Sequence, residues 1–191
     1  MKRREFSTAV LGALGAATTL SIAVSPAANA QPGAPVEGKD FTKILPPLPL
    51  PAGNKIVVYD FFSYACPHCN AFGPELDAWA KRLPADVTVQ HVPVPFLVNA
   101  ENFQRTYYAL EAMGQVDAMH RKVFAAVHVD RMRFDKPADI AAFMSKNGID
   151  GTKFLEMFNS FSVQTKVRQA TQLVQSAKLD GVPALAIQGK Y

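Results

Sequence analysis

A pair of cysteines placed directly between an apolar strand and a helix constrains this chain more than any other feature of its sequence. Residues 55–62 (KIVVYDFF) are almost continuously apolar and rich in β-branched and aromatic residues, which predicts a strand buried on both faces. The apolar residues that follow the cysteines have the spacing of one helix face: Phe72, Leu76, Trp79 and Leu83. Residues 87–94 (VTVQHVPV) predict a second strand, so the unit is β-α-β with parallel strands.

The two cysteines, Cys66 and Cys69, are the only ones in the 191 residues. A secreted scaffold held by disulfides would distribute more cysteines along the chain. A bridge between residues three apart closes too small a loop to stabilise a fold appreciably. A redox dithiol is therefore the favoured interpretation, with half of a metal site and an incidental structural bridge as alternatives.

The metal alternative lacks ligands in the sequence. A four-ligand zinc site would need two more ligands, and no second cysteine pair supplies them. None of the histidines has a metal-ligand spacing that accompanies a cysteine pair; they are His68, His91, His120 and His128. A C-x-x-C motif directly after a strand in a β-α-β pattern is instead typical of thiol redox chemistry. We therefore expect no metal and no cofactor other than the Cys66–Cys69 disulfide itself.

The position of Cys66-Pro67-His68-Cys69 predicts how the two sulfurs differ. Cys66 falls at the strand–helix junction, where free backbone N–H groups and the positive end of the helix dipole favour an anionic sulfur. Pro67 suits the first turn, and His68 adds a donor beside the thiolate. Cys69 lies one turn in, so we expect it to be more buried and to act as the resolving sulfur, with Cys66 as the attacking one. Because thiolate stabilisation favours the reduced form, the motif predicts a disulfide that is donated to substrate thiols.

The rest of the chain predicts a helical region and a return to the sheet. Periodicity predicts helices over 99 or 101 to 113, 116–128, 137–146, 150–158 and 162–178, and a strand over 184–187. Asp135 is expected to cap the helix at 137–146, and Asn147-Gly148 to end it. Residues 31–54 predict a proline-rich lead-in that contains a short edge strand over 41–45.

Residues 1–30 have the composition of a cleaved export signal. Lys2, Arg3 and Arg4 form a positive start, a weakly apolar stretch follows, and Ala28-Asn29-Ala30 fits a cleavage site. Arg3-Arg4 also fits a twin-arginine signal, and an uncleaved anchor is the alternative to both. These features predict a periplasmic protein. Lys2 to Glu5 account for half of the formal net charge of +4, and no dense basic run follows, so we expect no nucleic-acid partner.

Two motifs carry a resemblance to a known family. Residues 61–69 (FFSYACPHC) resemble the active-site segment of the periplasmic thiol:disulfide interchange proteins of the DsbA type, in the thioredoxin superfamily. Residues 181–184 (GVPA) resemble their second signature, a cis-proline loop that faces the dithiol. Residues 38–41 (GKDF) are similar to their N-terminal strand entry. The resemblance extends from about residue 36 to residue 191.

The resemblance implies an α/β fold of the thioredoxin type with an inserted helical domain. Residues 55–98 and 162–191 would form the thioredoxin-like domain, and residues 99–161 the helical insertion. Members of the family continue with another strand and a closing helix beyond the point that corresponds to Tyr191. We therefore expect the fold of this chain to lack those two elements.

The resemblance also assigns roles to residues outside the dithiol. It implies that Val182-Pro183 is a cis peptide that helps to bind an extended client peptide beside Cys66. It places Asp60 as the buried acid behind the active site, in a proton relay, with His91 as a polar partner near it.

The function predicted on this basis is donation of the Cys66–Cys69 disulfide to unfolded or partly folded exported proteins. The resemblance implies reoxidation by a membrane-bound, quinone-linked thiol oxidase and a monomeric state. A disulfide reductase or isomerase is the alternative within enzymes. A periplasmic chaperone or copper-binding module that uses the two cysteines and His68 is the alternative outside them.

Overall fold

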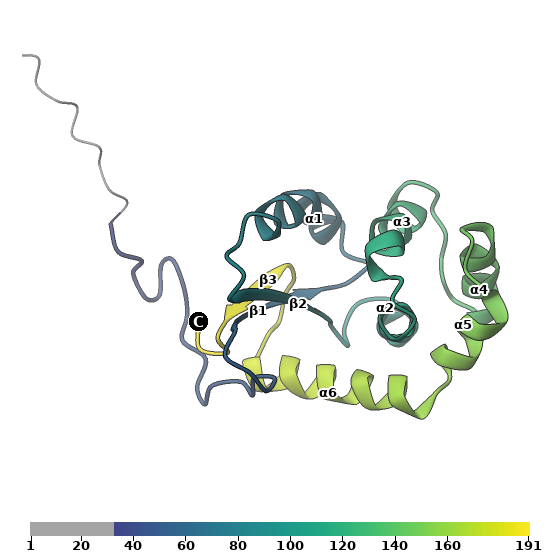
Figure 1. Cartoon of the computed structure of the whole chain (residues 1–191). Helices are drawn as coiled ribbons and strands as arrows, with labels where there is room; N and C mark the ends of the chain where they lie inside the picture. Colours follow the sequence, from purple (N-terminus) through teal and green to yellow (C-terminus); the bar gives the residue numbers. More distant parts are fainter. Residues whose placement is uncertain (1–32) are drawn as a thin grey trace, which may run out of the picture. The chain divides into compact units, whose positions relative to one another are not determined.

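A computed structural model describes residues 33–191 of the chain (Figure 1). The export signal predicted over 1–30 lies outside the described residues. The elements follow in the order β1 (Ile56–Phe62), α1 (Pro67–Ala80), β2 (Val87–Pro93), α2 (Ala100–Ala112), α3 (Val116–His128), α4 (Pro137–Lys146), α5 (Gly151–Phe158), α6 (Phe161–Ala177) and β3 (Ala184–Ile187).

Strand β1 is the centre of a three-stranded sheet with the order β2-β1-β3. It pairs in parallel with β2, so that Asp60 lies opposite His91, and antiparallel with β3, so that Asp60 also lies opposite Leu185. All residues of β1 after Ile56 are buried, as expected for a strand covered on both faces.

Helices cover the two faces of this sheet. Alternate side chains of β1 point to opposite faces. Tyr59 lines a cavity together with residues of α6, whereas Asp60 lines one together with residues of α1. Helices α2 to α5 are grouped together and are called the helical part below. They lie beyond one end of the strands, and α2 contacts β2 (Figure 1).

An aromatic cluster joins the sheet to the helical part. Phe62 at the end of β1 is 2 % exposed and makes edge or tilted ring contacts with five aromatic side chains: Tyr64, His91, Tyr107, His120 and Phe124. These residues come from β2, α2, α3 and the segment after β1. The core therefore passes without a break from the sheet to α2 and α3, directly behind the two cysteines.

Most predicted elements match the observed ones within one or two residues. Helix α1 ends at Ala80, so Leu83, which was predicted on its apolar face, lies beyond the helix. Two further predictions differ from the structure. The strand predicted over 41–45 is wrong, because this stretch forms only an isolated bridge between Glu37 and Phe41. Asp135 does not cap α4; the N-cap is Lys136, and the Asp135 carboxylate pairs with Arg133 at 2.8 Å. No helix of the described residues is both long and apolar enough to cross a membrane.

Candidate active site

Cys66 is the N-cap residue of α1, with extended backbone angles before the helix begins. Its Sγ accepts a hydrogen bond from the backbone N–H of Cys69, with 3.2 Å between sulfur and nitrogen. Pro67 and His68 form the first turn of the helix and are exposed. An N-terminal amide aimed at the sulfur, together with the positive end of the helix dipole, stabilises negative charge on Cys66.

Cys69 and Cys66 are both free thiols and are equally buried, with 4 % of each residue exposed. The prediction that Cys69 is the more buried of the two is therefore wrong in terms of exposed area. Their surroundings nevertheless differ. Burial, and then the hydrogen bond with Cys66, raise the pKa of the Cys69 thiol. Cys69 thus holds its proton strongly.

The loop that precedes β3 lies against the sulfur of Cys66. The Cys66 thiol donates to the carbonyl oxygen of Val182, 3.4 Å from Sγ. The Val182–Pro183 peptide bond is cis, as predicted. The structure therefore brings together two segments that are 116 residues apart in sequence, the dithiol and the Val182-Pro183 loop.

Behind the dithiol, Asp60 and His91 form a close pair. Asp60 is 4 % exposed, and its Oδ2 lies 2.7 Å from Nδ1 of His91. Both side chains line a small enclosed cavity of about 10 Å³, and Cys69 lines the same cavity from α1. A space of this size holds at most one water molecule. The geometry thus places a carboxylate, an imidazole and the Cys69 thiol around one small internal space.

Comparison with known proteins decides the family of this chain. It is 42% identical over 192 residues to the thiol:disulfide interchange protein DsbA of Bordetella parapertussis, covering 100% of this chain and 87% of that protein. It is 34% identical to DsbA of Pseudomonas aeruginosa over 154 residues, covering 81% of this chain and 73% of that protein. The chain belongs to the DsbA family.

A family model of the DSBA-like thioredoxin domain matches residues 96–191. The crystal structure of Pseudomonas aeruginosa DsbA superposes with a TM-score of 0.75 at 33% identity, covering 78% of each chain. Oxidoreductase DsbA from Xylella fastidiosa superposes with a TM-score of 0.78 at 30% identity, covering 82% of this chain and 86% of that one. The predicted thioredoxin fold with a helical insertion is thereby confirmed, and the chain is a thiol:disulfide oxidoreductase of the DsbA family.

Sequence reasoning missed the residues of α3 that surround this DsbA-type site. His120 Nδ1 lies 2.8 Å from the hydroxyl oxygen of Tyr64, and the His120 ring stacks on His91 with 5.0 Å between ring centroids. Burial, then the neighbouring His91 and Arg121, lower the pKa of His120 to about 3. The only available signal was a histidine on the apolar face of a predicted helix, which does not identify its partner.

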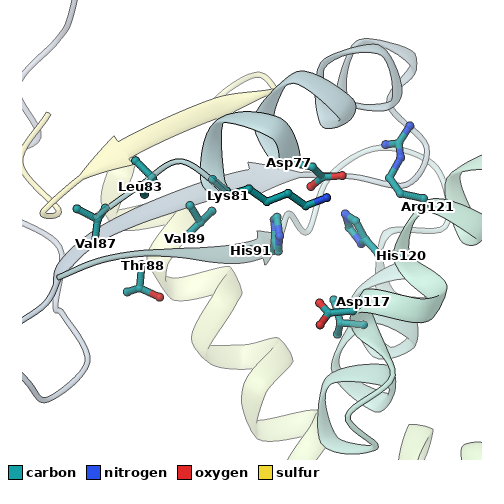
Figure 2. Close-up of a pocket in the computed structure, with 12 residues that line it drawn as sticks. Asp77, Lys81, Leu83, Val87, Thr88, Val89, His91, Asp117, His120 and Arg121 are labelled. Atoms are coloured by element: carbon teal, nitrogen blue, oxygen red, sulfur yellow. The ribbon is translucent and has the colours of Figure 1, made fainter. Parts of the chain in front are cut away.

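A groove of about 570 Å³ opens on the outer side of these two imidazoles (Figure 2). Figure 2 shows His91 on β2 and His120 on α3 pointing into it, below Asp77 of α1 and Lys81, the residue that follows α1. His91 lines both this groove and the small cavity behind Cys69. The Asp60–His91 pair thus lies between the dithiol and solvent.

Metal binding has little support from this geometry. In the part of the chain that the structure describes, no group of three or more His, Cys, Asp or Glu side chains is arranged to hold a metal ion. His68 is exposed on the first turn of α1, and the other three histidines contact Tyr64 or Phe62.

Proposed function

We propose that this DsbA-family protein works as an oxidase, donating the Cys66–Cys69 disulfide to thiols of exported proteins. The observation that carries the proposal is the position of Cys66 Sγ, 3.2 Å from the Cys69 amide at the N-terminus of α1. This environment stabilises a thiolate, which exists only in the reduced protein. A more stable reduced form makes the disulfide a stronger oxidant.

The reaction proceeds through a mixed disulfide. A substrate thiolate attacks Cys66 Sγ, the Cys66–Cys69 bond breaks, and Cys69 leaves with the electron pair and takes up a proton. A second substrate thiolate then attacks the substrate sulfur of the mixed disulfide, and Cys66 leaves as a thiolate. The substrate loses two electrons and gains a disulfide, and the protein ends with the dithiol seen in this structure.

We propose that Asp60 and His91 deliver a proton to Cys69 and remove it again. The raised pKa of the Cys69 thiol requires a proton donor when this sulfur leaves, and a base when it attacks during reoxidation. Asp60 shares the 10 Å³ cavity with Cys69, and His91 connects that cavity to the groove on the solvent side. The pair can therefore exchange the proton without using the face on which the client lies.

Clients and the oxidant would meet the dithiol beside the Val182-Pro183 loop. The Val182 carbonyl is already within 3.4 Å of Cys66 Sγ, where it can accept from an extended peptide. We propose unfolded or partly folded exported proteins as clients, and a membrane-bound, quinone-linked thiol oxidase as the reoxidising partner. The reaction needs no cofactor beyond the cysteine pair.

The predicted leader over 1–30 supports a periplasmic location, and a twin-arginine start is one route of export. We assign residues 55–98 and 162–191 to the thioredoxin-like domain, residues 99–161 to the helical insertion and residues 31–54 to the lead-in. We expect a monomer.

The test is the equilibrium reduction potential of the Cys66–Cys69 pair in glutathione buffers, measured on the chain without its leader. A value well above about −270 mV, that of thioredoxin, supports an oxidase. A value near it overturns the proposal in favour of a reductase or isomerase. The roles of the two sulfurs are separable: Cys69→Ser should accumulate a mixed disulfide through Cys66, and Cys66→Ser should form none.

A further inference from the structure

One face of α3 contacts Tyr64, which lies two positions before Cys66. His120, Phe124 and His128 are spaced four residues apart, so they lie on one face of the helix. All three contact Tyr64. The Tyr64 ring packs edge-on against Phe124 at 4.9 Å between centroids, its hydroxyl meets His120 Nδ1 at 2.8 Å, and its carbonyl oxygen lies 2.9 Å from His128 Nε2.

The donor and the acceptor can be assigned in both hydrogen bonds of Tyr64, the one with His120 and the one with His128. Tyr64 is 0 % exposed, and burial raises the pKa of its hydroxyl, so the phenol keeps its hydrogen and needs an acceptor. Among the described residues that acceptor is His120 Nδ1, which places the His120 hydrogen on Nε2, beside the groove. The Tyr64 carbonyl can only accept, so His128 donates from Nε2. The His120 imidazole therefore accepts a hydrogen bond from the Tyr64 side chain, and the His128 imidazole donates one to the Tyr64 main chain.

The same helix also holds the other end of the active-site motif. Arg121 Nη2 donates to the backbone carbonyl of Asn70, 3.0 Å away, in the residue after Cys69. Gly73 on α1 leaves the space in which the Arg121 guanidinium lies. Helix α3 thus contacts the chain on both sides of the Cys66–Cys69 pair.

We propose that His120 and His128 are positioning residues that clamp Tyr64 to α3 and thereby fix Cys66 in its N-cap geometry. The clamp tunes the reduction potential of the dithiol from the helical part of the molecule. This inference rests on the proposed role of Cys66 as the attacking sulfur.

The clamp should act more strongly on one redox form than on the other. In the oxidised form the Cys66–Cys69 bond itself restrains the segment from Tyr64 to Cys66. In the reduced form Cys66 Sγ keeps its place over the Cys69 amide only through non-covalent contacts. Loss of the clamp therefore destabilises the reduced form more than the oxidised form, which makes the disulfide a weaker oxidant.

Three single variants and one double variant test this. His120→Phe keeps an aromatic ring but removes the acceptor, and Tyr64→Phe removes only the hydroxyl. We expect each to lower the equilibrium constant for oxidation of glutathione by the protein about tenfold, or about 30 mV in potential. The double variant should lose no more than either single one, because both remove the same hydrogen bond. His120→Asn, which can present Oδ1 near the position of Nδ1, should remain within about twofold of the wild type.

A merely structural role predicts a different pattern. It would lower the melting temperatures of the oxidised and reduced forms by equal amounts and leave the potential unchanged, which would overturn the proposal. Tyr108→Phe is the matched control, since it removes another buried hydroxyl that is not in contact with Tyr64 or His120, and it should leave the potential unchanged. Should His120→Phe fail to fold, an unchanged potential in Tyr64→Phe alone is decisive against the clamp. Failure of the proposed function would show separately, as a low wild-type potential.

Discussion

The Asp60 carboxylate and the His91 imidazole face each other across the β1–β2 pair, with 2.7 Å between Oδ2 and Nδ1. The two residues are direct partners in the strand register, so the sheet itself sets their distance. Asp60 lies on the dithiol side of the pair and His91 on the groove side. In the proposed function, a proton enters or leaves the site through this pair while a client covers the opposite side of the dithiol.

Replacing Asp60 should slow the proton-linked step at Cys69. In Asp60→Asn we expect the mixed disulfide with glutathione to be resolved by Cys69 about a hundredfold more slowly at neutral pH, because the buried thiol loses its base. Rapid-mixing fluorescence of Trp79, the single tryptophan and part of α1, can follow the reaction. Asp86→Asn removes the same charge from an exposed position before β2 and should leave the rate unchanged. Equal rates in the two variants would contradict the assignment.

His120 should make the protein less stable in acid. Its pKa is lowered from 6.5 to about 3 in the folded state, so between those pH values the unfolded chain binds a proton that the folded chain does not. Stability is therefore complete above pH 6.5 and falls as the pH drops toward 3. At pH 4 the loss from this residue is about 3 kcal/mol. Charged or titratable groups approach the ring from all the neighbouring elements. They are Asp60 of β1, Cys69 and Asp77 of α1, Lys81 after α1, His91 of β2, Tyr107 of α2, Asp117 and Arg121 of α3, and Tyr64.

Urea unfolding of the wild type and of His120→Asn at pH 7 and pH 4 measures this effect. The variant should lose less stability than the wild type between the two pH values, since asparagine does not titrate. Parallel losses in both proteins would assign the acid sensitivity to another of these groups.

Gly73→Ala should destabilise the protein, contrary to the usual effect of this change in a helix. Alanine normally stabilises a helix interior by about 0.5–1 kcal/mol relative to glycine. Here a Cβ would overlap Arg121 Nη1 and displace the guanidinium from Asn70, so we expect a net loss of about 1 kcal/mol. In an Arg121→Ala background the same change should become stabilising. Denaturant unfolding of the four proteins of this cycle gives the sign in each background.

Asp150→Ala should cost about 1 kcal/mol of stability. Asp150 is the N-cap of α5, and its Oδ1 accepts from the amides of Thr152 and Lys153 at 3.0 and 3.1 Å. Asp139→Ala is the control, because Asp139 lies in the first turn of α4, which has no side-chain cap bond. Thermal unfolding of both variants should show the larger decrease for Asp150→Ala, and the reverse order would contradict the cap assignment.

Local patterns predicted the elements that carry the dithiol. The apolar run of β1, Pro67 at the start of α1 and the Asn147-Gly148 stop of α4 are all signals contained within a few residues, and all three are observed. The edge strand over 41–45 failed because a strand needs a partner along its length. Here Phe41 forms an isolated bridge with Glu37, and Ile44 donates a single backbone hydrogen bond to Lys190. Asp135 failed as a cap because Arg133 and Asn99 offer its carboxylate better partners than the free amides of α4.

The residues of the candidate site also differ in whether a local sequence pattern could identify them. Cys66, Cys69 and Val182-Pro183 could be named because each belongs to a short motif, and the structure brings them together. The clamp joins Tyr64 to His120, 56 positions away in sequence, and to His128, 64 positions away. No pattern within one helix shows which distant side chain a histidine contacts. Periodicity placed His120 and His128 on a helix, but only the packing of α3 against the β1–α1 connection gives them a partner.

The contacts of α3 on both sides of the dithiol mean that the thioredoxin-like segment does not determine its own redox character. A chimera that kept residues 55–98 but took its helical segment from a relative would replace the supports of Tyr64 and Asn70 together. Substitutions that accumulate in α3, outside every recognisable motif, would therefore adjust oxidising strength across a lineage while the CPHC tetrapeptide itself stayed the same.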